Sequence, residues 1–463
     1  MSTAASGSTL RAGAGVADIT PPTGTQLAGD IGRYRPVEEV REPLHARALA
    51  VEAGGRTACI LSLEVAGVLD EWVEEVRIQA QTRFGLAPES LMIHAIQNHA
   101  APCIGDHMIS RLYDALPADL WWLRGGDDRY NPVAVQGMLD AVEQALASLQ
   151  PVSTHVGRGI DGRVAFNRRF IMRDGSGRCH PPTCDPNILH CEGPTDPEVG
   201  VMTFRTGGGG TLAALVHHTC HPCHGYPHRY VIADWPGAWA TAEEELLGPG
   251  CVPLVLNGCC GNIHHTNHLD PHHAADHQAM GRKLAETTER VLERLESQDT
   301  PVVDSAARKL RIPLRVLEGE VLDAARRLIA ERPEPMWTDR TRTSIDWDWV
   351  YAVANLDLDL NRQRRPYYDY EIQAIRIGDA AIVALVGEPF VEGQLRLKLE
   401  SPAPFTFVAH NCNGFVGYLP TVEAFAHGGY ETRTGNWSKL VPEALDAVVD
   451  ETVALLKGLF SRL

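Results

Sequence analysis

The stretch "TLAALVHHTCHPCHGYPH" (residues 211–228) joins a short apolar run directly to a dense cluster of histidines. Four consecutive glycines precede the run, so the pattern predicts a turn followed by a buried strand. The stretch contains five of the chain's 20 histidines. Polar groups just beyond the end of a strand are typical of ligand sites in α/β proteins. This segment therefore indicates both a fold class and the region of a functional site.

The same order, an apolar strand followed by polar groups, recurs elsewhere in the chain. The strand-like runs 90–95, 252–258 and 380–386 lead to His99, to the segment 257–262 and to Glu388. The runs 46–53 and 57–66 are joined by two glycines, a turn signal. Helical patterns occupy 70–84, 237–248, 275–297 and the C-terminal 443–463. Together these patterns predict an α/β fold with mixed sheets flanked by helices.

A single domain over residues 10–463 is the expected organisation, because no composition break marks a linker. Two tryptophan-rich, irregular stretches near 111–132 and 333–352 do not fit the alternating pattern. We interpret them as insertions. They could form walls or lids over a site, or they could be ordinary surface packing.

The charge balance limits the class of partner. The chain has 42 basic and 59 acidic residues, a formal net charge of −17. This acidity argues against nucleic acid and against stable membrane association, and it leaves a small molecule as the expected substrate. The first fifteen residues lack a secretory pattern, and eleven cysteines show no disulfide framework, so we expect a cytoplasmic protein with reduced thiols. A homo-oligomer is compatible with these features.

A metal site is the chemistry that the histidines favour, since the common serine hydrolase, zincin and nucleotide-binding motifs are absent. Zinc binds imidazole and carboxylate, and a catalytic zinc keeps one position open. Cys220 and Cys223 have the spacing of a structural zinc site, but no second matching pair exists. One metal takes about four ligands, so most of the histidines would only surround it.

Nine segments of the chain form a pattern when they are taken in order. They are 12–24, 42–55, 96–102, 164–169, 195–205, 221–239, 257–263, 386–390 and 417–431. Together they resemble the catalytic domain of the neutral/alkaline (non-lysosomal) ceramidases, from about residue 12 to about residue 435. The resemblance implies the fold of that domain. The chain looks like a divergent member that lacks the C-terminal immunoglobulin-like domain of the family.

The resemblance implies one zinc per chain, held by two histidines, a glutamate and a tyrosine. Matched by motif, the ligands are His221 in "HP", Glu388 in "GEP" and Tyr418 in "GYLP". The family pattern for the first ligand has two histidines, whereas "IQNHAAP" (96–102) keeps only the later one, so His99 is the predicted ligand. If the ligand corresponds to the earlier position, this chain has Gln97 there, and His217 or His218 could then complete the site.

The resemblance also implies that Tyr430 and Arg168 hold the reacting oxygen and that Asp234 orients a ligand. His264, in a loop that follows a predicted strand, is our candidate for moving a proton to the leaving group.

These residues predict a zinc-dependent hydrolase that cleaves an amide or ester of a small, polar substrate. Two alternatives remain open at this level. One is a metal-dependent lyase or isomerase that acts on a hydroxylated or sugar-like substrate. The other is a non-catalytic, histidine-rich metal-binding protein.

Overall fold

A large sheet and a smaller one form the framework of the protein. The computed structural model describes residues 9–298 and 300–461. The large sheet has nine strands in the order β16-β14-β13-β8-β1-β3-β4-β6, with β18 added beside β8. The strands are β1 (Arg11–Asp18), β3 (His45–Ala53), β4 (Arg56–Leu63), β6 (Leu91–Ala95), β8 (Gln150–Ile160), β13 (Glu198–Thr206), β14 (Thr211–His218), β16 (Val252–Asn257) and β18 (Glu296–Gln298).

The smaller sheet has the order β19-β20-β21-β23 and packs against one face of the large one. Its strands are β19 (Val303–Pro313), β20 (Tyr367–Ile377), β21 (Ala380–Leu385) and β23 (Phe405–Ala409). Leu49 and Ile60 of the large sheet share one apolar core with Ile375 and Phe407 of the smaller one. Burying these facing side chains is the main stabilisation that such a pair of sheets can gain.

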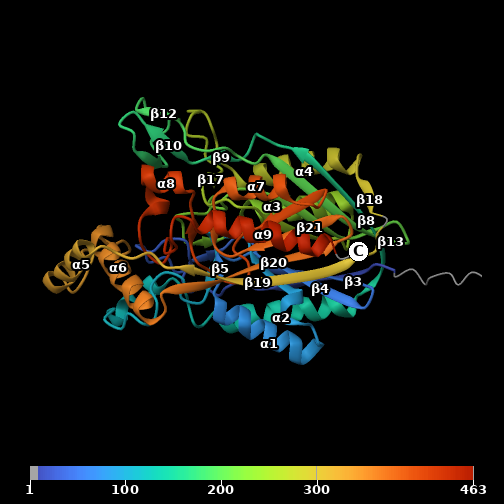
Figure 1. The fold of residues 1–463 in the computed structure, drawn as a ribbon, viewed down its shortest axis with the longest axis horizontal. Coiled ribbons are helices and arrows are strands. Elements are labelled where there is room, and N and C mark those ends of the chain that lie inside the picture. The colour runs from blue at the N-terminus through green and yellow to red at the C-terminus, as the bar shows by residue number, and fades with distance from the viewer. Residues whose placement is uncertain (1–8, 299, 462–463) are drawn as a thin grey trace, which may run out of the picture.

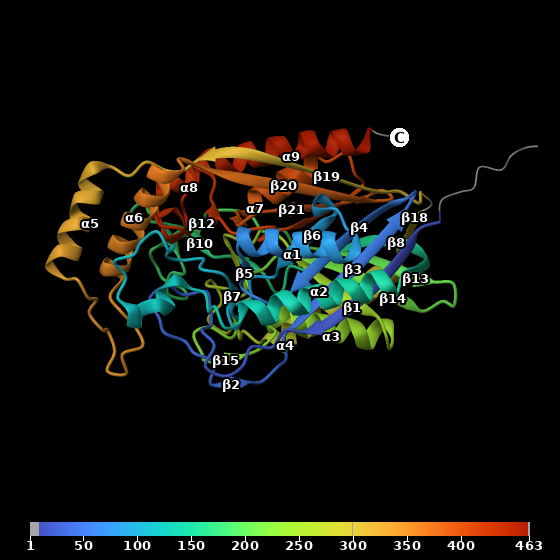
Figure 2. The same ribbon diagram turned by 90° about the horizontal axis from the view of Figure 1, so that it is seen from below.

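Helices cover the two outer faces, so the molecule has four layers (Figures 1 and 2). Alternation along the strands explains why both faces of the large sheet are buried: Val201 and Val216 face the helices, whereas Met202 and Leu215 face the smaller sheet. The helices over the large sheet are α1 (Asp70–Phe84), α2 (Asn131–Ala147), α3 (Asp234–Leu247) and α4 (His277–Leu292). Those over the smaller sheet are α7 (Val391–Glu400) and α9 (Ala444–Phe460).

The other elements are short or lie outside the layers. Helices α5 (Gly319–Glu331) and α6 (Trp347–Arg364) form one end of the molecule, opposite the end at β8 and β18 (Figures 1 and 2). The rest are β2 (Glu39–Val40), β5 (Gly67–Val68), β7 (Cys103–Ile104), β9 (Phe166–Asn167), β10 (Arg169–Met172), β11 (Gly177–Cys179), β12 (Ile188–Cys191), β15 (Tyr230–Val231), β17 (Ile263–His264), β22 (Glu388–Pro389), β24 (Tyr418–Leu419), α8 (Val422–His427) and the 3₁₀ turns η1 (Pro88–Ser90), η2 (Ala118–Arg124) and η3 (Tyr430–Thr432).

The predicted α/β class is confirmed, and so are the predicted strands. The two glycines between β3 and β4 have φ of 58° and 76°, the left-handed values that a tight hairpin turn requires. Strands β4 and β6, joined through α1, run parallel, as do β14 and β16. Within each pair the two carboxyl ends therefore lie side by side, and predicted site residues follow them.

Several predicted boundaries are wrong. The helix predicted over 237–248 begins at Asp234, and that predicted over 275–297 covers only His277–Leu292, because Asp276 caps its start and 296–298 pair with β8 as a strand. The stretch predicted to be irregular up to 352 already becomes helix α6 at Trp347, which Asp346 caps. Of the predicted terminal helix, Arg462 and Leu463 lie outside the described residues.

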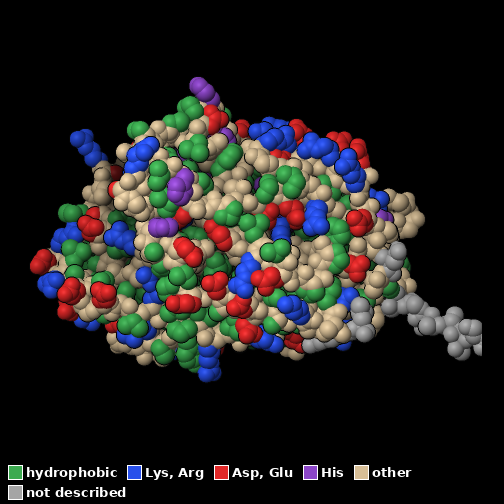
Figure 3. Space-filling model, turned by 45° about the horizontal axis from the view of Figure 1, so that its top comes forward, with side chains coloured by type: hydrophobic (Ala, Val, Ile, Leu, Met, Phe, Trp, Pro, Cys, Tyr) green, Lys and Arg blue, Asp and Glu red, His purple; other side chains and the backbone are tan. Residues whose placement is uncertain are grey.

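The surface and the thiols add two observations. On the face seen in Figure 3, acidic and basic side chains are intermixed. All eleven cysteines lie in the described residues, and each is free of a disulfide.

Within residues 9–298 and 300–461, no helix combines the length and the apolar character needed to cross a bilayer.

Candidate active site

A pocket of about 540 Å³ opens where the strands of both sheets end. Five of the eight predicted site residues line it: His99, Arg168, His264, Tyr418 and Tyr430. A smaller cavity of about 30 Å³ shares His99, Tyr418 and Tyr430 with the pocket and adds Glu388 to its lining. The structure therefore brings these six predicted residues together around two connected cavities.

Asn257, at the end of β16, connects the two loops that carry the predicted histidine ligands. Its side-chain Nδ2 donates to the carbonyl oxygens of Ile96 and Cys220, both at 2.9 Å. A second link joins the loops directly, because the amide of His99 donates to the carbonyl of Pro222 at 3.0 Å. These bonds bring His99 and His221 together from strands far apart in sequence.

The His99 ring is oriented by Gly29. The Gly29 carbonyl accepts a hydrogen bond from the ring, and a Cβ added to Gly29 would lie 2.2 Å from His99 Nδ1. A larger residue at position 29 would therefore displace the imidazole. Burial lowers the pKa of His99 to about 3, so the ring is neutral at physiological pH and can offer Nε2 as a ligand.

His221 is fully buried, and its two ring nitrogens have different environments. Nδ1 donates to the carbonyl of Cys260 at 2.7 Å, which fixes the tautomer. Nε2 is buried and lacks a hydrogen-bond partner among the described residues. A ligating histidine almost always has this arrangement, one nitrogen held by a carbonyl and the other free for the metal.

Glu388 faces that free nitrogen. Strands β22 and β24 pair in parallel, which places Glu388 beside Tyr418. Its Oε2 lies 3.6 Å from His221 Nε2 and, like that nitrogen, has no hydrogen-bond partner within the described chain. Burial raises the pKa of Glu388 to about 7, although Gln97 and Tyr418 donate hydrogen bonds that oppose the shift.

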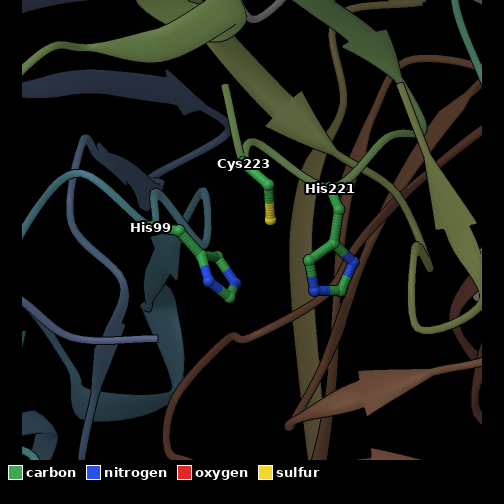
Figure 4. A group of neighbouring side chains, drawn as sticks. All are labelled: His99, His221 and Cys223. Atoms are coloured by element: carbon green, nitrogen blue, oxygen red, sulfur yellow. The ribbon is translucent and has the colours of Figure 1, made fainter. Parts of the chain in front are cut away.

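Cys223 joins the two histidines in a second grouping. One ligand atom from each of His99, His221 and Cys223 lies within 4.8 Å of the others, and the three side chains point toward a common space (Figure 4). Imidazole nitrogen and thiolate sulfur are ligands that zinc prefers. The unpartnered nitrogen of His221 and this donor set both fit a bound metal ion.

Arg168 is held rigidly by an acid that follows a predicted site residue. Glu431 accepts from Arg168 Nε at 3.0 Å and from Arg169 Nη1 at 2.6 Å. Arg168 Nη2 also donates to the hydroxyl of Tyr418 at 3.2 Å. Burial alone would raise the pKa of Glu431, but the two guanidinium groups bring it below its ordinary value. Glu431 therefore stays ionised and anchors the arginine.

Tyr430 lies next to Tyr418, with ring centroids 5.8 Å apart, and both line the pocket. His264 also lines it, where the His180 ring packs edge-on at a centroid distance of 4.4 Å. Burial lowers the pKa of His264 well below its ordinary value, so the ring is neutral. The amide of Thr266 donates to Nδ1, which leaves the proton on Nε2.

Asp234 is fully buried at the start of α3, and its direct partner is His224 rather than a predicted ligand. Its Oδ1 accepts from His224 Nδ1 at 2.7 Å, and Oδ2 accepts from the amide of His224 at 2.8 Å. Burial would raise the pKa of Asp234, but His224 and the backbone donors lower it to about 2. The residue fixes the loop that directly follows Cys223.

The alternative ligands have other partners. His217 Nε2 contacts the carbonyl of Val408, and His218 Nδ1 contacts that of Glu198, both in the strands. Gln97 Oε1 lies 2.9 Å from His410 Nε2. Neither His217 nor His218 belongs to the donor group found among the described residues.

Sequence reasoning missed several residues of the site. Arg35 is fully buried and donates to the carbonyls of Ala28, His99 and His228, so it connects three loops. Its segment carries no motif that could have identified it. Cys223 was visible in the histidine cluster, but its spacing from Cys220 suggested only a structural site.

The sequence matches no protein-family model and no curated protein. Two solved structures are similar over 98% of this chain. The neutral ceramidase from Pseudomonas aeruginosa has a TM-score of 0.74 at 18% identity, with 75% of that chain covered. A ceramidase complexed with C2 has a TM-score of 0.73 at 17% identity, with 76% of that chain covered. The chain therefore has the fold of the neutral ceramidases, as its sequence resemblance predicts.

Proposed function

We propose that the protein is a metal-dependent hydrolase, with zinc as the metal, that cleaves an amide or ester bond of a small polar molecule. One observation carries the proposal: His221 Nε2 and Glu388 Oε2 are buried 3.6 Å apart, and neither has a hydrogen-bond partner in the described parts of the chain. Leaving two buried polar atoms unpaired costs free energy, which a bound metal would recover. Both similar structures are ceramidases, which supports amide hydrolysis.

His221 would hold the metal together with His99 and Glu388, and Tyr418 lies beside that carboxylate. The histidine orientations fit this role, since each Nδ1 faces a backbone carbonyl. A bound divalent metal supplies Lewis acidity, which polarises the substrate carbonyl and makes water nucleophilic at neutral pH.

The protein's own groups would then stabilise charge and move protons. Arg168 and Tyr430 line the pocket and can donate to the oxygen on which negative charge develops, a role worth about 10²-fold or more per donor. Because Glu431 fixes Arg168, the donor is already oriented before substrate binds. Neutral His264 can exchange a proton with the leaving group.

The pocket combines an aromatic lining with polar groups that would recognise the polar atoms of a substrate. It includes the rings of His180, His264 and His265 with the charged side chains of Asp30 and Arg168. A volume of about 540 Å³ falls within the usual range for sites that bind small molecules. Tyr226 and Trp347 supply aromatic surface at the same pocket.

The test combines metal content with a hydrolysis screen. Zinc per chain is measured by elemental analysis for the wild type and for His221→Ala. Both proteins are then incubated with short N-acyl amides and short-chain esters, and amine or alcohol release is followed. We expect about one zinc per wild-type chain, near none in the variant, and hydrolysis only by the wild type.

Water enriched in oxygen-18 separates hydrolysis from elimination. Label in the carboxylate product supports the proposal, and turnover without label would replace it with the lyase alternative. Several metals per chain that persist in His221→Ala would instead indicate a histidine-rich metal-binding protein.

A further inference from the structure

Cys223 is the feature of the pocket that the expected ligand set leaves unexplained. It lies two residues after His221 and lines the pocket near His99. Its ligand atom belongs to the three-residue donor group, in which all separations are within 4.8 Å. Figure 4 shows the thiol directed into the space between the two imidazoles.

The loop that carries Cys223 is fixed on both sides. The Cys223 amide donates to the His221 carbonyl at 3.1 Å, and the Tyr226 amide donates to the Cys223 carbonyl at 3.2 Å. Next along the chain, Asp234 accepts from the amides of His224 and Gly225 at 2.8 and 3.3 Å. The thiol is therefore positioned by backbone hydrogen bonds.

A second pocket cysteine provides a contrast. Cys179 lines the same pocket, but its thiol hydrogen-bonds to Glu431. The Cys223 thiol makes no such bond within residues 9–298 and 300–461, and it forms no disulfide. Of the two thiols, Cys223 is the one placed to bind a metal.

The distances suit one ion. Zinc binds nitrogen at about 2.0–2.1 Å and sulfur at about 2.3 Å, so ligands at tetrahedral angles lie about 3.3–3.6 Å apart. Atoms within 4.8 Å of one another would move closer by about 1 Å to reach that geometry. The buried, unpartnered Nε2 of His221 is an independent sign that a ligand belongs here.

We propose that Cys223 is a metal ligand and that, with His99 and His221, it forms a mixed imidazole–thiolate centre. The proposal rests on the proposed metal-dependent function and specifies its ligand set. A centre with one thiolate binds Zn²⁺ or Co²⁺ through a softer donor than carboxylate or phenolate oxygen. Glu388 would complete the centre with its carboxylate from β22, and Tyr418 lies beside it in β24.

Cobalt substitution tests the ligand directly. Metal-free protein is loaded with Co²⁺, and its near-ultraviolet absorption is recorded for the wild type, Cys223→Ser, Cys179→Ser and His221→Ala. A thiolate ligand gives an intense sulfur-to-cobalt charge-transfer band. We expect the band in the wild type and in Cys179→Ser, its complete loss in Cys223→Ser, and no bound cobalt in His221→Ala.

A chemical measurement avoids dependence on one variant. Wild-type protein is treated with iodoacetamide with and without zinc, and each cysteine is quantified by mass spectrometry. Zinc should slow alkylation of Cys223 by about tenfold or more, because a coordinated thiolate is shielded. Exposed Cys184 should react equally in both samples and serves as the internal control.

The outcomes separate this proposal from the function on which it rests. Cobalt that binds and depends on His221 but gives no charge-transfer band would overturn the Cys223 ligand and leave the proposed function intact. A band that survives in Cys223→Ser would do the same. Wild-type protein that binds no cobalt and no zinc would overturn both.

Discussion

Glu388 and Asp234 are both buried carboxylates beside a histidine, yet their environments have opposite effects. Asp234 accepts hydrogen bonds from the His224 ring and from the amides of His224 and Trp235, and its pKa falls to about 2. Glu388 keeps one oxygen unpaired in the described structure, and burial raises its pKa to about 7. Burial alone therefore does not set the pKa of these two acids; the charge of the neighbouring groups and the hydrogen bonds to both oxygens decide the direction of the shift.

The largest expected effect comes from changing Glu388, whose Oε2 has no hydrogen-bond partner among the described residues. Glu388→Gln keeps the shape of the side chain but removes its charge and basicity. We expect turnover of a substrate identified in the screen to fall about 10³-fold, or about 4 kcal/mol in the barrier, with the fold unchanged. Steady-state kinetics and circular dichroism measure the two properties. Activity within tenfold of wild type would remove Glu388 from the catalytic machinery.

Glu243 sharpens the comparison because it is also a buried carboxyl but lies in α3, away from the pocket. Trp239 Nε1 donates to it at 2.7 Å, and burial raises its pKa from 4.5 to about 7. The folded state thus binds more protons than the unfolded state between these values, so this residue lowers stability as pH rises through that window. The penalty is complete above about pH 7.

We expect Glu243→Gln to stabilise the protein by up to about 3 kcal/mol at pH 8 and by little at pH 4, with full activity. Urea unfolding at both pH values measures the difference. An equal gain at the two pH values would show that the carboxyl does not titrate abnormally. Lost activity would show that the enzyme needs this buried carboxyl group, although it lies outside the pocket.

The sequence predicts the framework of the protein better than its details. Apolar runs such as 380–386 have the length and composition of buried strands, and the glycine pair at 54–55 suits a tight hairpin, so those elements follow from local physics. The ends of helices are harder to predict from the sequence. The start of α3 depends on Asp234, whose interactions with the His224 loop are not visible in the sequence.

The candidate site divides in the same way. His99, His221, Glu388 and Tyr418 follow strands or belong to matched motifs. Three of them line connected cavities, and His221 lies 3.6 Å from Glu388. Arg35 acts through carbonyls of three distant loops, and Cys223 acts through proximity to His99, 124 positions away in the chain. Such contacts depend on tertiary structure, so no local pattern indicates them.

The smallest effect should come from Asp234, whose two carboxylate oxygens both accept hydrogen bonds. Because the folded pKa of Asp234 lies near 2, below its ordinary 3.8, its contribution is present above about pH 4 and is lost as pH falls through 2. Asp234→Asn should therefore cost about 2 kcal/mol at pH 7, and the difference from wild type should narrow between pH 4 and pH 3.

Urea unfolding of Asp234→Asn at pH 7, pH 4 and pH 3 measures the loss of stability. Zinc affinity shows whether the substitution also changes metal binding. Asp234 holds the amides of His224 and Gly225, directly after Cys223, so a looser loop should also weaken metal binding. A stable Asp234→Asn with unchanged zinc affinity would mean that the hydrogen bonds of Asp234 are replaceable. A loss of affinity larger than the loss of stability would instead show that the Asp234 carboxylate positions the metal centre through the loop that carries Cys223.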